Sequence, residues 1–350
     1  MLLQELLKKE NNNIDLLRLI AALAVIYGHA FAITPQPPLV DFVGARIVGE
    51  YSGSVAVKFF FFLSGLVVTN SLIRNPSIFN FVGARAARLL PGLAVCILVT
   101  TFVIAPHFST LAFSDYLRDR LPYSYAWLGM TFRPEWALPG VFAGNPLSAV
   151  NGSLWTLPSE ANCYIALAAL AALGALRWTW VATTATLGII VVLTLIYLGV
   201  IHGLYVEKHE TTLLQIYFFS GVTLCLVSPY VEISKWTVGG LLAVAYLLKS
   251  TVVYPTLLVS TLLVLGLWLS TTRAVRKIRL PGDYSYGVYL YGFFIQQCIK
   301  AAFPSLDLRW HQIICMFIAL ACGAVSWHFI ERPVMQFWKQ RSVFFGKFRR

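Results

Sequence analysis

Charged residues are scarce in this chain of 350 residues. Asp, Glu, Lys and Arg together make up only 12% of it, whereas 58% of the residues are hydrophobic. Soluble domains carry about twice that share of charge. The composition therefore excludes a water-soluble protein and predicts one that lies in a membrane.

Alternation of polar and apolar residues is also missing, which excludes an outer-membrane β-barrel. No repeat recurs at a fixed period, so a repeat protein is excluded as well. The chain instead carries continuous apolar stretches of roughly 20 residues, the length that an α-helix needs to cross a bilayer. We predict an all-α, polytopic transmembrane bundle of about ten spans: 14–33, 54–72, 89–105, 154–176, 179–201, 212–227, 236–248, 253–270, 284–303 and 311–329.

Cysteine is present without any CxxC pair, and all six cysteines fall in predicted spans. This pattern supports neither a disulfide framework nor a zinc site, and we predict no bound metal. The cysteines are expected to act as small apolar packing residues: Cys96, Cys163, Cys225, Cys298, Cys315 and Cys322.

No segment between spans is long enough for a soluble domain, and no small-residue cleavage site follows the first span. We therefore expect the first span to remain as a signal anchor. Residues 1–350 should form a single membrane domain, with a core over about 11–338 and a short basic tail at 339–350. The largest gap, residues 106–153, is expected to form a structured external cap or a re-entrant segment.

Positive charge is distributed unevenly across the predicted topology. If the N-terminus is cytoplasmic, seventeen Lys and Arg residues fall in inside segments and only seven fall outside. The positive-inside rule then places both termini in the cytoplasm. The net charge of +12 is explained by attraction to anionic membrane lipid and needs no nucleic acid. The seven outside charges are Arg46, Arg118, Arg120, Arg133, Lys208, Lys249 and Arg309.

A few ionisable residues lie inside or beside the apolar spans, where each needs a polar partner or a function. Arg18 and His29 are eleven residues apart, so they share one face of a helix at about 16 Å separation. Asp15, three residues before Arg18, is placed to pair with it. The alternative is that Arg18 reaches the membrane surface and His29 lies below the headgroups. Lys58 and Lys300 are buried cations to which the sequence assigns no partner.

Two further segments carry matching signals. Arg85 and Arg88 lie one helical turn apart and suit a polyanion such as a nucleotide phosphate, although ordinary inside positive charge also explains them. Glu160 enters the membrane soon after Pro158, at a depth similar to that of His29. It could equally be a carboxylate stabilised at a helix N-terminus.

These motifs together resemble the acyltransferase-3 family of integral membrane acyltransferases, over nearly the whole chain. The R-x10-H pair of RLIAALAVIYGH is the most specific feature. The segment SLWTLPSEANCY is similar to the WSLxxExxFY motif of the family, with Trp155, Glu160 and Tyr164 in register. Four more segments resemble family motifs in the same order: KFFFFLSGLVVTNSL, ARAARLLPGL, DYSYGVYLYGFFIQQ and WHFIERPVMQ.

The sequence departs from the family pattern at three positions. Gly292 stands where a histidine is often found, Phe294 replaces a proline, and Pro158 replaces the commoner serine or valine. No role is carried over to Gly292. The chain also lacks the extracellular hydrolase-like domain that some members bear, so it resembles the stand-alone membrane module.

The resemblance implies an enzyme of the bacterial cytoplasmic membrane that transfers an acyl group, usually acetyl, from acyl-CoA to the hydroxyl of an extracytoplasmic carbohydrate. Its partners are then acyl-CoA as donor substrate, a carbohydrate acceptor and membrane lipid, with no tightly bound cofactor. The acceptor, the acyl length and the oligomeric state stay open.

Catalytic roles follow as hypotheses. Arg85 and Arg88 hold the phosphates of the donor, and Arg18 lines its path or polarises its carbonyl. His29 acts as general base or as acyl carrier. Glu160 orients the imidazole or binds the acceptor. Further candidates at the site are Asp15, Trp155, Tyr164, Ser64 and Tyr286; the backbone of Ser64 and Gly65 and the hydroxyls of Tyr284, Tyr286 and Tyr289 are candidate oxyanion stabilisers.

Two other functions remain as alternatives. A secondary transporter also carries charged residues inside the membrane, but it predicts two similar halves with helices broken at matching positions, and the sequence shows no such pairing. A sensor or scaffold that kept the fold without its chemistry is the second, and the intact Arg18, His29 and Glu160 argue against it.

Overall fold

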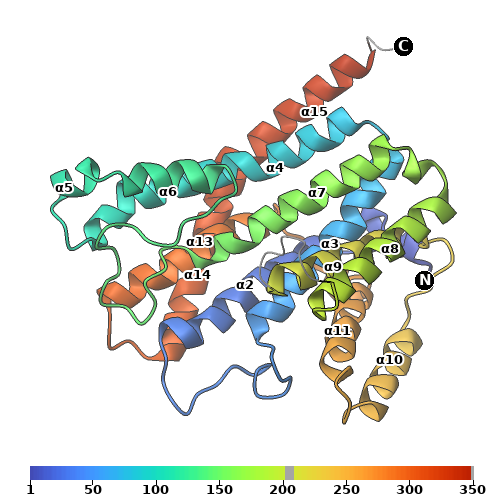
Figure 1. The fold of residues 1–350 in the computed structure, drawn as a ribbon, viewed down its shortest axis with the longest axis horizontal. Helices are drawn as coiled ribbons and strands as arrows, with labels where there is room; N and C mark the ends of the chain where they lie inside the picture. Colours follow the sequence, from blue (N-terminus) through green and yellow to red (C-terminus); the bar gives the residue numbers. More distant parts are fainter. Residues whose placement is uncertain (202–208, 348–350) are drawn as a thin grey trace. The chain divides into compact units, whose positions relative to one another are not determined.

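The computed structural model describes residues 1–201 and 209–347. Lys208 and residues 348–350, which entered the charge distribution and the predicted basic tail, lie outside the described residues. Figure 1 shows the course of the chain.

The described residues are helical and carry only two isolated β-bridges, which confirms the all-α prediction. Short 3-10 turns and two π-helical segments connect or extend the helices. The α-helices are α1 Leu3–Leu6, α2 Ile14–Ile33, α3 Ser52–Arg74, α4 Ile78–Leu98, α5 Phe113–Arg118, α6 Leu121–Met130, α7 Leu157–Ala172, α8 Thr179–Tyr197, α9 His209–Leu226, α10 Lys235–Leu247, α11 Tyr254–Ser270, α12 Arg273–Lys277, α13 Ser285–Ala302, α14 Leu308–Ser326 and α15 Arg332–Lys347.

Each of the ten predicted spans contains a helix, and the bounds of α2 match the prediction. Five helical segments among the described residues are long and apolar enough to cross a membrane: Ile14–Ile33, Ser52–Arg74, Ile78–Phe108, Thr179–Tyr197 and Leu308–Arg341. Others are shorter. The 13 residues of α10 cover only about 20 Å of the roughly 30 Å of hydrocarbon. These segments indicate an integral membrane protein, whereas the count of ten crossings and the side of the termini stay predictions.

The chain divides into two compact units. The first contains Met1–Ala21, Phe42–Phe81 and Asn162–Pro281, and the second contains Ala22–Asp41, Val82–Ala161 and Gly282–Arg350. Helices α2, α4 and α7 contribute residues to both.

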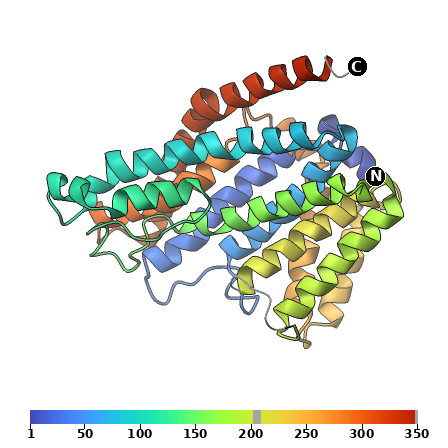
Figure 2. The ribbon, with the colours of Figure 1, turned by 45° about the horizontal axis from the view of Figure 1, so that its top comes forward.

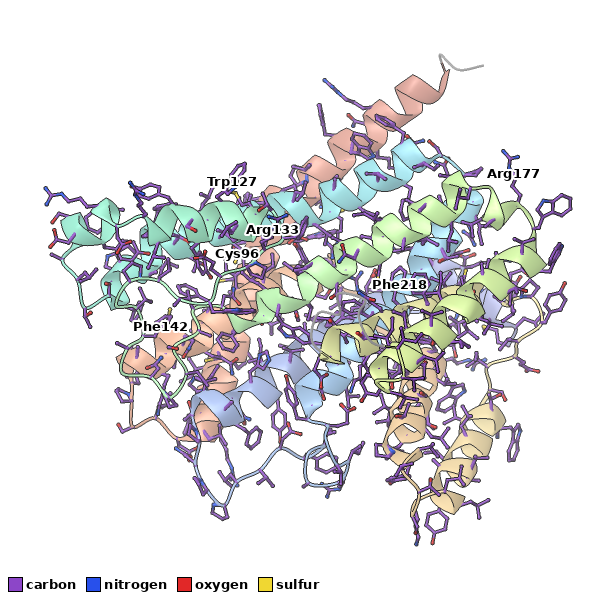
Figure 3. The ribbon with its side chains drawn as sticks, in the orientation of Figure 1. Cys96, Trp127, Arg133, Phe142, Arg177 and Phe218 are labelled. Carbon is purple, nitrogen blue, oxygen red and sulfur yellow. The ribbon has the colours of Figure 1, made fainter. Side chains whose placement is uncertain are left out.

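In the first unit, α3 and α9 lie side by side (Figure 1). Their backbones approach closely at two glycines: a Cβ on Gly65 would lie 2.0 Å from the carbonyl oxygen of Phe218, and one on Gly221 would lie 2.1 Å from that of Phe62. Phe218 is labelled in Figure 3. Glycine at such crossings lets apolar helices pack without a hydrophobic driving force.

In the second unit, α13 and α14 lie side by side (Figure 1), and a Cβ on Gly287 would lie 2.8 Å from the Cα of Gly323. Helix α15 runs beside α4 (Figure 2), where the indole of Trp338 fills the space left by Gly83. Both contacts depend on a residue without a side chain. A Cβ on Gly83 would lie only 1.8 Å from the ring of Trp338.

Residues 106–153, expected to form a structured external cap or a re-entrant segment, are structured. This segment contains a 3-10 turn at Ala105–Phe108, the helices α5 and α6, and a bridge between Ser109 and Val141. The hydroxyl of Tyr116 donates to the carbonyl of Thr101 over 2.8 Å. Burial raises the pKa of Tyr116, so its hydroxyl keeps the proton that it donates.

Candidate active site

Helix α2 carries both members of the R-x10-H pair. It is unbroken from Ile14 to Ile33, so Arg18 and His29 differ by about 20° in direction and by about 16 Å along its axis. Both residues are partly accessible. Arg18 belongs to the first unit and His29 to the second, and their shared face is a property of α2 itself. Asp15 lies 3.9 Å from the ammonium of Lys9.

The imidazole of His29 contacts α13. Its ring lies edge-on to Phe293, with ring centroids 5.2 Å apart and an angle of 79° between the planes. Phe293 is in turn covered by Gly152, where a Cβ would lie 2.7 Å from the aromatic ring. At Gly292, a Cβ would lie 2.7 Å from the side chain of Ile26. The glycine that departs from the family pattern therefore brings α13 close to α2.

Two buried glutamines also bind the backbone of α2, within the turn that leads to His29. The amide of Gln296 on α13 donates to the carbonyl of Ile26 over 2.8 Å, and that of Gln312 on α14 donates to the carbonyl of Tyr27 over 3.1 Å. Neither glutamine belongs to the residues that the sequence motifs predicted for the site. An uncharged amide inside an apolar span is the signal that would have found them, because it needs a partner there.

The segment leading to Glu160 is fastened to α13. The side chain of Asn151 donates to the carbonyl of Leu290 over 2.8 Å. The hydroxyl of Tyr289 donates to the carbonyl of Ser153 over 2.9 Å, and the Thr156 hydroxyl lies 2.7 Å from the same tyrosine oxygen. These bonds fix the 3-10 turn Gly152–Thr156 from which α7 begins.

Glu160 lies in the first turn of α7, two residues after Pro158. Proline is tolerated there because the first N–H groups of a helix have no partner within it. The Glu160 carboxylate acts electrostatically on the hydroxyl of Tyr286, which places these two predicted site residues in one neighbourhood. Trp155 is partly exposed in the preceding turn.

Arg88 is enclosed by acidic and aromatic side chains within the second unit. Its guanidinium donates to Glu331 over 2.6 Å and to Asp283 over 2.7 Å. The same group lies 5.3 Å from the ring centroid of Tyr286 and 5.4 Å from that of Trp327. Two carboxylates therefore more than balance the charge of Arg88.

The neighbouring Arg85 has a different environment. It is partly exposed, and its buried Nε has no hydrogen-bond partner among the described residues. The two arginines of the RxxR motif are therefore not equivalent. An incoming anion would meet a less neutralised charge at Arg85.

Two tyrosine hydroxyls that were candidate oxyanion stabilisers already donate their single proton. Tyr286 donates to the carbonyl of Leu89 over 2.8 Å, and Tyr289 to that of Ser153. The hydroxyl of Tyr284 lies 3.1 Å from Nε2 of His328.

In the first unit, Ser64 of α3 and Tyr164 of α7 share a hydrogen bond of 2.8 Å. The structure thus brings together two segments that the family resemblance singles out. The structure also identifies partners for two cations. Lys58 pairs with Glu50 in the first unit, and Lys300 donates to the carbonyl of Pro304 over 2.7 Å in the second.

No group of three or more His, Cys, Asp and Glu side chains is placed to hold a metal ion within the described residues. The arrangement described above consists of acid-base and hydrogen-bonding groups. Such groups can position a hydroxyl and move its proton.

One protein family and two known proteins match this chain over most of its length. The acyltransferase domain family matches residues 11–328. An O-acetyl transferase of Shigella phage Sf6 is 27% identical over 345 residues, covering 92% of this chain and 96% of the phage protein. Nodulation protein 10 of Rhizobium leguminosarum bv. viciae is 26% identical over 360 residues, covering 93% of each chain. No solved structure matches the chain significantly.

Proposed function

This chain belongs to the acyltransferase-3 family and is an O-acyltransferase, and we propose that it transfers an acetyl group from acetyl-CoA in the cytosol to a hydroxyl of an envelope glycan on the other side of the bacterial cytoplasmic membrane. These matches confirm the prediction of an enzyme and not the alternative of a secondary transporter. The observation that carries the proposal is the unbroken α2, which presents Arg18 and His29 on one face.

The thioester arm of coenzyme A is long and thin, whereas its nucleotide is charged. The nucleotide stays at the inner face, where Arg85 contacts its phosphates directly. Arg88 is the second member of this pair, and Asp283 and Glu331 orient its guanidinium. Arg18 lines the path of the thioester along α2.

His29 acts as the general base. Its neutral imidazole takes the proton from the acceptor hydroxyl while the hydroxyl oxygen forms a bond to the thioester carbonyl carbon. The tetrahedral intermediate then expels the coenzyme A sulfur, which takes up a proton as the thiol. The acyl-carrier route differs in one respect: the imidazole itself accepts the acetyl group first. Glu160 orients the imidazole or holds the acceptor.

The first test replaces the imidazole. We expect His29→Ala to reduce acetyl transfer from labelled acetyl-CoA to the envelope glycans of membrane vesicles by at least about 100-fold, with the protein level in the membrane unchanged. His107→Ala, at an exposed position after α4, is the control and should retain activity. Wild-type turnover by His29→Ala would refute the proposed mechanism. Label retained on the wild-type protein without acceptor would favour the acyl-carrier route.

The second test addresses the donor. Arg85→Ala should raise the KM for acetyl-CoA about tenfold or more with a smaller change in kcat, because loss of one charge-assisted phosphate contact costs about 1.5–3 kcal/mol. Arg74→Ala removes an exposed arginine at the end of α3 and should leave KM unchanged. An unaltered KM in Arg85→Ala would contradict the phosphate role.

The acceptor is tested on cells. Mass spectrometry of envelope glycans from cells with and without the gene should show an added acetyl mass only when the protein is present. Identical glycan masses in both strains would contradict a glycan acceptor.

A further inference from the structure

The turn of α2 that carries His29 is intrinsically weak. Gly28 precedes the histidine inside the helix, and glycine destabilises a helix interior by about 1 kcal/mol relative to alanine. A general base must be held within a fraction of an ångström of its working position. The turn therefore needs support from outside α2.

The second unit supplies this support through two amide side chains. Gln296 donates to the carbonyl of Ile26 and Gln312 to that of Tyr27, and these two residues come directly before Gly28 and His29 in the same turn of α2. Both glutamines are buried, where a hydrogen bond resists exchange with water. Since each bond fixes one peptide plane, the pair restrains both the rotation and the height of the His29 turn.

The two donors are themselves held in register. Nε2 of His311 donates to the backbone carbonyl of Gln296 over 3.1 Å, which ties α14 to α13 at this level. Gly292 lets α13 approach Ile26, and Phe293 contacts the imidazole ring from the same helix. Two amide hydrogen bonds and one ring contact, made by α13 and α14, therefore hold the same turn of α2.

We propose that Gln296 and Gln312 are positioning residues for acyl transfer, which fix the turn of α2 that carries His29. They act through the backbone of α2 and touch neither the donor nor the acceptor. This inference rests on the proposed function, in which His29 is the general base.

Pairs of substitutions separate the hydrogen bond from the space that the side chain fills. Gln296→Met and Gln312→Met keep the approximate volume and lose the donor. Gln296→Glu and Gln312→Glu keep the shape, and a carboxyl group buried in an apolar site retains its proton and can donate in place of the amide. We expect each Met variant to lose about 10- to 100-fold in kcat with KM for acetyl-CoA changed less than twofold, and each Glu variant to regain most of that loss.

Gln297→Met is the matched control. Gln297 is the next residue of α13, is equally buried, and donates to the carbonyls of Leu147 and Ala149 instead of to α2. It should not show a selective loss of kcat. Protein level and thermal stability are measured for every variant in the same detergent.

Several results would overturn the inference. One is a wild-type kcat in both Met variants, and another is equal kcat in the Met and Glu variants of each pair. Failure of both Met variants to reach the membrane would assign the glutamines to stability alone. An active His29→Ala would refute the proposed function instead, so the two failures are distinguishable.

Discussion

Arg88 shows how one side chain acquires a role that its sequence motif does not reveal. In the RxxR pattern it looks equivalent to Arg85, yet its guanidinium bridges Glu331, which is 0% exposed, and Asp283. Ser326 and Ser285 donate further hydrogen bonds to these carboxylates, over 2.8 and 2.5 Å. A buried ion pair is costly to break because removal of one partner leaves an uncompensated charge.

We therefore expect Arg88→Ala to destabilise the protein by about 3–5 kcal/mol, the usual effect of removing one member of a buried ion pair. Thermal unfolding in detergent should show a melting temperature several degrees below that of the wild type. Arg85→Ala is the matched control and should melt near the wild type. Equal melting temperatures for the two variants would contradict the bridging role.

At this scale the sequence predicted where side chains lie on a helix better than what they contact. The spacing of Arg18 and His29 placed them on one face, because helical periodicity is a local property of the chain. The contacts of Arg88 with Asp283 and Glu331 span 195 and 243 residues, and no local pattern encodes them. Gln296 and Gln312 were missed because an uncharged amide does not interrupt an apolar span.

At the scale of the helices, the crossing of α3 and α9 in the first unit depends on glycines that face backbone. At Gly65 and Gly221 the atoms that a Cβ would meet are carbonyl oxygens and amide nitrogens of the partner helix, which cannot rotate away. The space between α3 and α9 is therefore fixed by the backbone. This explains Gly65 in the LSG segment without a role as oxyanion stabiliser.

Gly65→Ala and Gly221→Ala should each destabilise the protein by at least about 1–3 kcal/mol, the usual cost of overpacking. Gly188→Ala and Gly239→Ala are the controls, because no atom lies within 4 Å of their added Cβ. Those two should be neutral or stabilising by about 0.5–1 kcal/mol. Thermal unfolding of the four variants in one detergent measures the difference. A Gly65→Ala protein as stable as Gly239→Ala would show that α3 and α9 do not pack this tightly.

Both π-helical segments precede a proline. Val99–Ile104 ends two residues before Pro106, and Trp327–Glu331 ends two residues before Pro333. Proline lacks an N–H and clashes with the carbonyl four residues earlier, and a wider turn relieves that clash. The WHFIERP segment continues as helix through Glu331 into α15.

At the scale of the whole molecule, the helices were predicted well because the length of each apolar run can be counted directly in the sequence. All ten predicted segments are helical. The division into two units could not be predicted, since residues of α2, α4 and α7 fall into both and no linker or change in composition marks the boundaries. The continuation of the last span into α15 was likewise missed, because its basic residues resemble an ordinary tail.

The topology rests on the distribution of positive charge, and accessibility to a reagent outside the cell can test it. With both termini in the cytoplasm, the loops after the first and seventh predicted spans are outside, and those after the fourth and sixth are inside. Four exposed positions sample these sides: Val40 and Val252 outside, and Leu173 and Tyr230 inside. Leu173 falls within the fourth predicted span, 154–176, but in the structure it directly follows α7, which ends at Ala172.

Each position is changed to cysteine in a chain whose six native cysteines are replaced by serine or alanine, and intact cells are treated with a membrane-impermeant maleimide. We expect Val40→Cys and Val252→Cys to react at once, and Leu173→Cys and Tyr230→Cys only after the membrane is permeabilised. The inverse pattern would place the termini outside, and with them the basic segments that the proposed donor site needs on the cytosolic side. Reaction of all four in intact cells would mean that fewer than ten segments cross the membrane, because Val40 and Leu173 are separated by three predicted spans and Tyr230 and Val252 by one.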